Sequence, residues 1–129
     1  MTRQREVLNW AMSTFGLIAS HRDERAARLV EEAIEVAQAE RVPQHVLAKI
    51  LERVYSRPPG DLVQEIGGVA ITLDALAENV YVSVDIAAQA ELDRVLLKSR
   101  EHFQKKHAEK VAAGVANLTD VGTQRVNEL

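Results

Sequence analysis

Three glutamates at positions 31, 32 and 35 are the residues of this sequence whose types and spacing could do chemistry. Apolar residues around them recur every three or four positions, which predicts an amphipathic helix from about Asp23 to Glu40. At about 100° per residue, Glu32 and Glu35 are expected about 60° apart, at one edge of the apolar stripe. Glu31 is expected beyond the other edge, facing solvent or a neighbouring chain.

A second line of polar residues belongs to a helix predicted from about Asp61 to Asn79, after the helix-breaking segment SRPPG. Asp61, with Gln64 three residues later, predicts an N-cap and its capping-box partner. One face of this helix is expected to enter the core: Leu62, Ile66, Val69, Leu73, Leu76 and Val80. Along its edge run Asp61, Glu65, Gly68, Thr72 and Asn79.

Carboxylates at the edge of a helical core have two interpretations. They can form an ordinary solvated face, because glutamate is common on helix surfaces. They can also hold Mg²⁺ or Mn²⁺, since magnesium takes hard oxygen ligands and bridges carboxylates to substrate phosphates. A cation would relieve the repulsion among clustered acids.

The remaining pattern predicts three more helices. They run from about Thr2 to Phe15, ending at Gly16, from Pro43 to Tyr55 with a first-turn proline, and from Ser83 through Phe103 towards Lys110. Residues 112–129 lose the period and are expected to form a mobile tail. We therefore expect an all-α bundle of four to five helices, with one domain over residues 1–111. Its alanine-rich stripes leave apolar surface that a second copy could cover.

Composition excludes several classes of protein. The 129 residues contain no cysteine, which excludes disulfides and thiolate sites, and four scattered histidines give no zinc-site spacing. No P-loop, dinucleotide-binding or serine-hydrolase motif occurs. A net charge of −3 disfavours nucleic acid as a partner. No apolar run approaches the roughly 20 residues of a membrane span, and the N-terminus lacks a signal-peptide core, so a cytoplasmic location is expected.

The order of the acidic motifs resembles the MazG-like all-α nucleoside triphosphate pyrophosphatases, particularly a phage and bacterial branch. The family pattern is EExxE on one helix and ExxD on a later one. Glu31, Glu32 and Glu35 match the first motif, and Glu65 matches the first acid of the second. Gly68 stands where the family has its second acid, so the sequence departs from the pattern there. The resemblance spans about Trp10 to Phe103.

This resemblance implies a helix bundle that forms homodimers or homotetramers and cleaves a (d)NTP to (d)NMP and pyrophosphate with Mg²⁺ or Mn²⁺. The implied metal ligands are Glu32, Glu35 and Glu65. Asp61 either supplies the missing oxygen or only caps its helix. Glu31 and Glu35 are the candidate catalytic carboxylates that orient or deprotonate the attacking water. The alternative is a catalytically silent helical dimer that binds nucleotides or other proteins.

Candidate substrate-binding residues come from several elements. The segment KSREHF resembles a family motif in which Lys98 faces the triphosphate, with Arg94 as a helper one turn earlier. Asn79 lies on the polar edge of its helix. Trp10, the only tryptophan, could stack on a base or pack in the core. The final candidates form a basic helix end that could neutralise phosphates or only stabilise the helix C-terminus: Lys105, Lys106 and Lys110.

Overall fold

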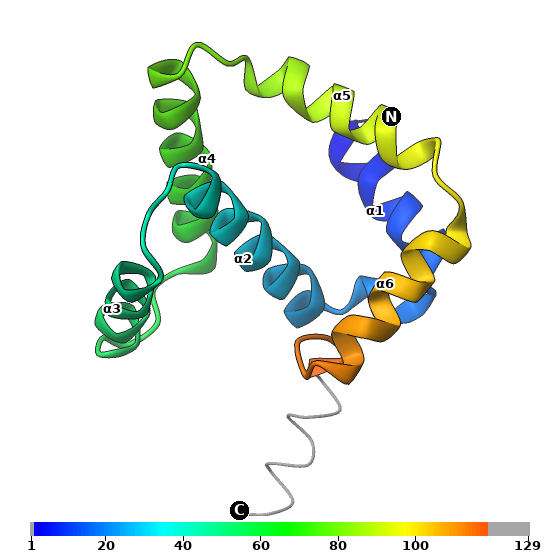
Figure 1. Ribbon diagram of the computed structural model, residues 1–129, viewed down its shortest axis with the longest axis horizontal. Coiled ribbons are helices and arrows are strands. Elements are labelled where there is room, and N and C mark those ends of the chain that lie inside the picture. Colours follow the sequence, from blue (N-terminus) through cyan, green and yellow to red (C-terminus); the bar gives the residue numbers. More distant parts are fainter. Residues whose placement is uncertain (1, 119–129) are drawn as a thin grey trace, which may run out of the picture. The chain divides into compact units, whose positions relative to one another are not determined.

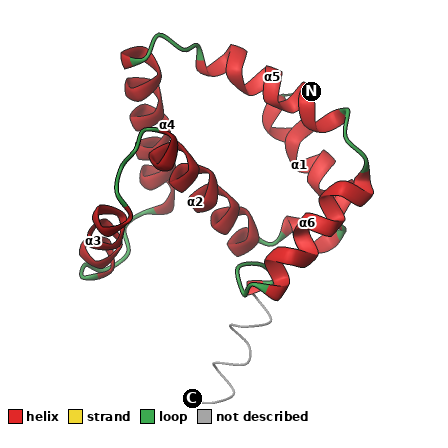
Figure 2. Cartoon of the chain, viewed as in Figure 1, coloured by secondary structure: helices red, strands yellow, loops and turns green. Residues whose placement is uncertain are grey.

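Residues 2–118 of the chain are described by a computed structural model (Figure 1). These residues form two compact units, the first made of residues 2–40 and 96–118 and the second of residues 41–95. Every regular element in the described part is a helix, and no strand occurs there (Figure 2). The predicted all-α fold class is therefore confirmed. None of the helices in residues 2–118 is both long and apolar enough to cross a lipid bilayer.

The first unit contains three α-helices and one short 3₁₀ helix: α1 (Arg3–Phe15), η1 (Leu17–Ser20), α2 (Arg22–Ala39) and α6 (Arg100–Ala112). Thr2 caps α1 by accepting a hydrogen bond from the amide of Arg5 at 3.2 Å. Gly16 ends α1 with a φ of 81°, a left-handed conformation that glycine adopts without steric cost. This reversal starts η1, which the sequence pattern did not predict. η1 in turn contacts both α1 and α2.

Small and aromatic residues hold α1 against α6, two helices that are distant in sequence and in contact in the fold. Ala11 and Thr14 of α1 are buried. Trp10 packs edge-on against Phe103 of α6, with ring centroids 5.0 Å apart, an arrangement favoured by the ring quadrupoles. The side-chain amide of Gln104 donates to the Thr14 carbonyl at 3.2 Å. These contacts position α6 within the first unit.

The second unit contains α3 (Gln44–Tyr55), α4 (Leu62–Asn79) and most of α5 (Val84–Leu96). Pro43 occupies the N-cap position of α3 and not its first turn. Asp61 is the N-cap of α4, as predicted, and its Oδ2 accepts from the amide of Gln64 at 3.0 Å. Within residues 41–95, only Ala77 and Leu92 are buried.

The apolar stripe of α4 does not form a core in the described chain, contrary to the sequence-based expectation. Five of its six members are 40–58% exposed: Leu62, Ile66, Val69, Leu73 and Val80. The sixth, Leu76, is half-buried. Helical periodicity tells which residues share a face, but it does not tell what covers that face.

The single long helix predicted from Ser83 to Lys110 is wrong. Helix α5 ends at Leu96 and α6 begins at Arg100, with a turn between them. The Ser99 hydroxyl accepts a hydrogen bond from the amide of His102 at 3.2 Å, which makes Ser99 the N-cap of α6. Serine competes with helix continuation in this way because its side chain replaces a backbone carbonyl as acceptor.

Part of the predicted tail packs against α2. Helix α6 extends to Ala112, and residues 113–118 form what we call the C-terminal turn. Ala116 in this turn is only 2% exposed, and the Leu118 amide donates to a side chain of α2. These six residues of the expected tail therefore contact α2. The rest of that tail, residues 119–129, lies outside the described residues.

Candidate functional site

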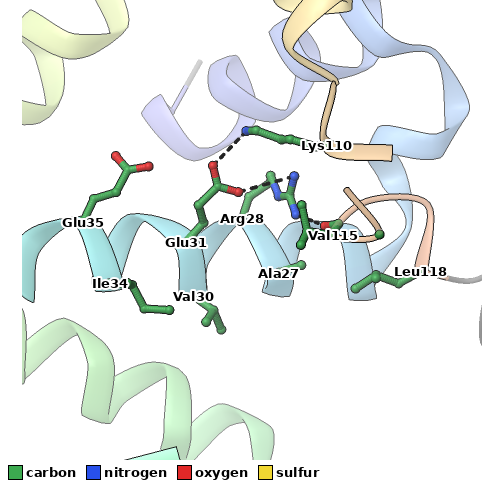
Figure 3. A pocket seen from close by; sticks show the side chains of 10 residues that line it. Ala27, Arg28, Val30, Glu31, Ile34, Glu35, Lys110, Val115 and Leu118 are labelled. Atoms are coloured by element: carbon green, nitrogen blue, oxygen red, sulfur yellow. Dashed lines mark hydrogen bonds and ion pairs between the residues drawn. The ribbon is translucent and has the colours of Figure 1, made fainter. Parts of the chain in front are cut away.

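Helix α2 carries a line of charged residues along its length. Glu24, Arg28, Glu31 and Glu35 are spaced i, i+4, i+7 and i+11, which places them on one side of a helix. We call these four residues the polar stripe. The expectation that Glu31 lies opposite Glu35 is wrong, because residues four apart are only about 40° apart around a helix. Both side chains extend to the same side of α2 (Figure 3).

Glu24 at the start of the polar stripe is a buried carboxylate. It is 2% exposed, and its Oε1 accepts the backbone N–H of Leu118 at 2.9 Å. Burial lowers the pKa of the neighbouring Arg25 guanidinium; the Glu24 carboxylate opposes this effect and the Arg28 charge adds to it. The hydrogen bond from the Leu118 amide to the Glu24 carboxylate attaches the C-terminal turn to α2, and it is charge-assisted.

Arg28 and Glu31, further along the polar stripe, also connect α2 to the C-terminal turn and to α6. Arg28 donates through Nη2 to the Val115 carbonyl of the C-terminal turn, and its Nη1 lies 3.5 Å from Glu31 Oε2. Lys110, near the end of α6, places its Nζ 3.0 Å from Glu31 Oε1 (Figure 3). The side chains of Lys110 and Glu31 are each 32% exposed and that of Arg28 is 19% exposed, so this triad is partly desolvated.

A groove of about 600 Å³ lies within the first unit, between α2, the end of α6 and the C-terminal turn. This volume is in the range of small-molecule sites, roughly 300–1,000 Å³. Its charged lining is Arg28, Glu31, Glu35 and Lys110. Val30 and Ile34 line it from the other side of α2 (Figure 3). The exposed lining of the groove is therefore almost entirely apolar, and the charged groups of α2 and α6 lie at its border.

Glu35 lies at the end of the polar stripe beyond the last contact with α6. It lines the groove and is exposed, and it makes no hydrogen bond or ion pair with any residue in the described part of the chain. Glu32 is also exposed but does not line the groove. Of the three acids in the EExxE motif, the structure therefore brings Glu31 and Glu35 to the groove.

The candidate acids of the second unit are on the first turn of α4. Asp61 uses one carboxylate oxygen as the helix cap. The Glu65 carboxylate folds back over Gly60, where an added Cβ would lie 2.7 Å from Glu65 Oε1. A side chain at position 60 would therefore displace the end of this exposed and flexible carboxylate.

Gly68, the departure from the ExxD motif, faces open space. A Cβ added there would meet nothing within 4 Å, and the same holds for Gly67. The Thr72 hydroxyl donates to the Gly68 carbonyl at 2.5 Å. Asn79 is the last residue of α4.

The expected triphosphate-binding residues are arranged differently from the sequence-based expectation. Lys98 is exposed in the turn between α5 and α6 and not on a helix. Because α5 ends at Leu96, Arg94 is not one helical turn before Lys98. Arg94 instead pairs with both carboxylate oxygens of Glu91, at 2.8 and 2.5 Å. Trp10 belongs to the aromatic cluster between α1 and α6, as its packing interpretation predicted.

Sequence reasoning missed Arg28 and Lys110 as partners of Glu31. The Arg28–Glu31 spacing of three was a usable local signal. No local pattern could connect Lys110 with Glu31, since their proximity depends on how α6 packs. Within neither unit do three or more His, Asp or Glu side chains of the described chain gather closely enough to hold a metal ion. Comparisons of the chain with protein-family models, curated proteins and solved structures found no match.

Proposed function

We propose that this protein is a Mg²⁺-dependent nucleoside triphosphate pyrophosphohydrolase that converts a (d)NTP to (d)NMP and pyrophosphate. The observation that carries the proposal is the pair of carboxylates, Glu31 and Glu35, on one side of α2 at a groove of nucleotide-compatible volume. The order of the acidic motifs, which resembles the MazG-like family, supports the same activity. The supporting structural contacts all lie within the first unit.

Carboxylate oxygens are ligands that Mg²⁺ prefers, and Glu35 offers an exposed carboxylate that is unpaired within residues 2–118. The donor chemistry of this residue therefore fits the metal. Glu32, which does not line the groove, is assigned as a further ligand by resemblance alone, as are Glu65 and Asp61. When bound, the metal supplies charge neutralisation at the phosphates and lowers the pKa of a bound water.

Glu31 is the proposed general base. It accepts a proton from the attacking water, whose oxygen forms the new bond to the α-phosphorus. The α–β anhydride bond breaks, and its electron pair leaves with pyrophosphate. In the ligand-free protein Arg28 and Lys110 contact the Glu31 carboxylate beside the groove, at 3.5 and 3.0 Å.

A homodimer or homotetramer is part of the proposal. The apolar stripe of α4 is largely exposed, and contiguous apolar surface of this kind is typical of an interface. A second copy of the chain is the proposed cover.

The decisive experiment is an assay of the purified protein with each common (d)NTP and Mg²⁺ or Mn²⁺, with detection of monophosphate and pyrophosphate. Glu35→Gln should reduce turnover at least about 100-fold, because it removes a charged ligand without changing the side-chain shape. Glu52→Gln, on the exposed surface of α3, is the matched control and should retain activity. Absence of turnover with every nucleotide would refute the proposed activity.

A catalytically silent nucleotide-binding or protein-binding dimer is the second candidate. Gly68 favours it, since glycine cannot supply the second acid of the ExxD motif. In that case nucleotide would bind without release of pyrophosphate. Gly68→Asp restores the motif and has space for the side chain, so the appearance of turnover in this variant alone would favour the silent candidate.

A further inference from the structure

The charges at the groove are unequal around Glu31. Two cations, Lys110 and Arg28, contact this single carboxylate, at 3.0 and 3.5 Å. These three groups together carry a net charge of +1, and the Glu35 carboxylate further along the same lining balances it. Because the three side chains are only 19–32% exposed, this charge is less screened than on an open surface.

Arg28 also has unused hydrogen-bonding capacity. Its Nη2 donates to the Val115 carbonyl and its Nη1 forms the 3.5 Å ion pair with Glu31, whereas its buried Nε has no hydrogen-bond partner in the described chain. Buried donors without an acceptor are unfavourable. A guanidinium group matches the paired oxygens of a phosphate, and an ammonium group adds a point charge. The chemistry that would satisfy both cations is an oxyanion with several oxygens.

The apolar side of the groove suits a ligand that also has a less polar portion. Val30 and Ile34 are 56% and 48% exposed, so they offer uncovered aliphatic surface beside the cations. A nucleotide, with phosphates at one end and a base and sugar at the other, has this distribution of polarity. A simple inorganic anion would contact only the charged residues at the border of the groove.

We propose that Lys110 and Arg28 bind the phosphates of the substrate and that Glu31 is their internal counter-ion until the substrate arrives. Phosphate oxygens then compete with Glu31 for both cations, and the Glu31 carboxylate becomes available to accept the proton of the attacking water. Naming the ligand as a nucleoside triphosphate rests on the proposed function. The assignment of the phosphate-binding residues rests on the groove geometry and replaces Lys98 and Arg94 in this role.

The test measures binding separately from catalysis. Inorganic tripolyphosphate is titrated into the full-length protein by isothermal calorimetry without Mg²⁺. Lys110→Met should weaken binding about 10-fold, because it removes one of two phosphate-binding charges. Lys49→Met removes the same charge from an exposed position of α3 and serves as the matched control, with less than a 2-fold change expected. Circular dichroism verifies that each variant is folded.

Glu31→Gln distinguishes phosphate binding from a purely structural ion pair. This variant removes the competing carboxylate, so tripolyphosphate should bind at least about 3-fold more tightly. The inference is overturned if the wild-type protein does not bind tripolyphosphate, if Lys110→Met binds as the wild type does, or if Glu31→Gln weakens binding.

Failure of the proposed activity has a different signature from failure of this inference. Tripolyphosphate binding with the expected variant effects, but no hydrolysis of any nucleotide, would refute the activity and support the phosphate site. Hydrolysis with an unchanged KM in Lys110→Met would support the activity and overturn the phosphate site.

Discussion

Glu24 shows how strongly one residue can tie together distant parts of this chain. Its side chain is the largest fully buried one in residues 2–118, although it is a carboxylate and not an apolar group. A charge is tolerated there because its Oε1 accepts the Leu118 amide at 2.9 Å and Arg25 lies next to it in the sequence. Local pattern could not predict this role, because an acid in the first turn of a helix is ordinarily explained by the helix dipole.

Replacing Glu24 tests its structural role. Glu24→Ala should lower the free energy of unfolding by about 1–3 kcal/mol, since it leaves the partly buried Leu118 amide without its acceptor. Glu24→Gln keeps an oxygen at the same place and should cost less. Urea denaturation followed by circular dichroism measures both values. Equal stability of Glu24→Ala and the wild type would show that the C-terminal turn does not depend on this bond.

At the scale of elements, the helices follow local rules closely at their ends. Gly16 ends α1, and Asp61 caps α4 through a 3.0 Å hydrogen bond to the Gln64 amide. The exception was Ser99, whose cap divides a segment that periodicity alone joins into one helix. Periodicity is insensitive to a short interruption of this kind, because the apolar pattern resumes on the other side.

The two adjacent glycines of α4 allow a prediction at this scale. Gly68→Ala should raise the free energy of unfolding by about 0.5–1 kcal/mol, since alanine favours the helix and its Cβ meets nothing within 4 Å. Gly67→Ala is the matched comparison and should give a similar gain. Thermal denaturation of the two variants measures the effect. A loss of stability in Gly68→Ala alone would show that another surface approaches α4 at Gly68.

At the scale of the whole molecule, uncovered apolar surface is the main feature still to be explained. Within residues 41–95 only Ala77 and Leu92 are buried, while the apolar stripe of α4 is mostly exposed. A unit with so few buried residues gains little hydrophobic stabilisation by itself. Association of chains would supply the missing burial.

Oligomer formation is tested with one substitution on the α4 stripe. We expect the wild type to sediment as a dimer or tetramer in analytical ultracentrifugation and Ile66→Glu to sediment as a smaller species, because a buried charge opposes association. Ile71→Glu introduces the same charge on the opposite side of α4 and is the control. A monomeric wild type would contradict the expectation, as would an Ile66→Glu variant with the wild-type sedimentation coefficient.

The sequence by itself determined the all-α class, the positions of most helices and the presence of Glu31 and Glu35 on α2. These features depend on propensity, periodicity and caps, which act between residues a few positions apart. Only the tertiary structure decided that Lys110 reaches Glu31, that Leu118 bonds to Glu24 and that residues 113–118 form one side of a groove. Such contacts depend on how α6 packs against α1, and local patterns contain no information about that packing.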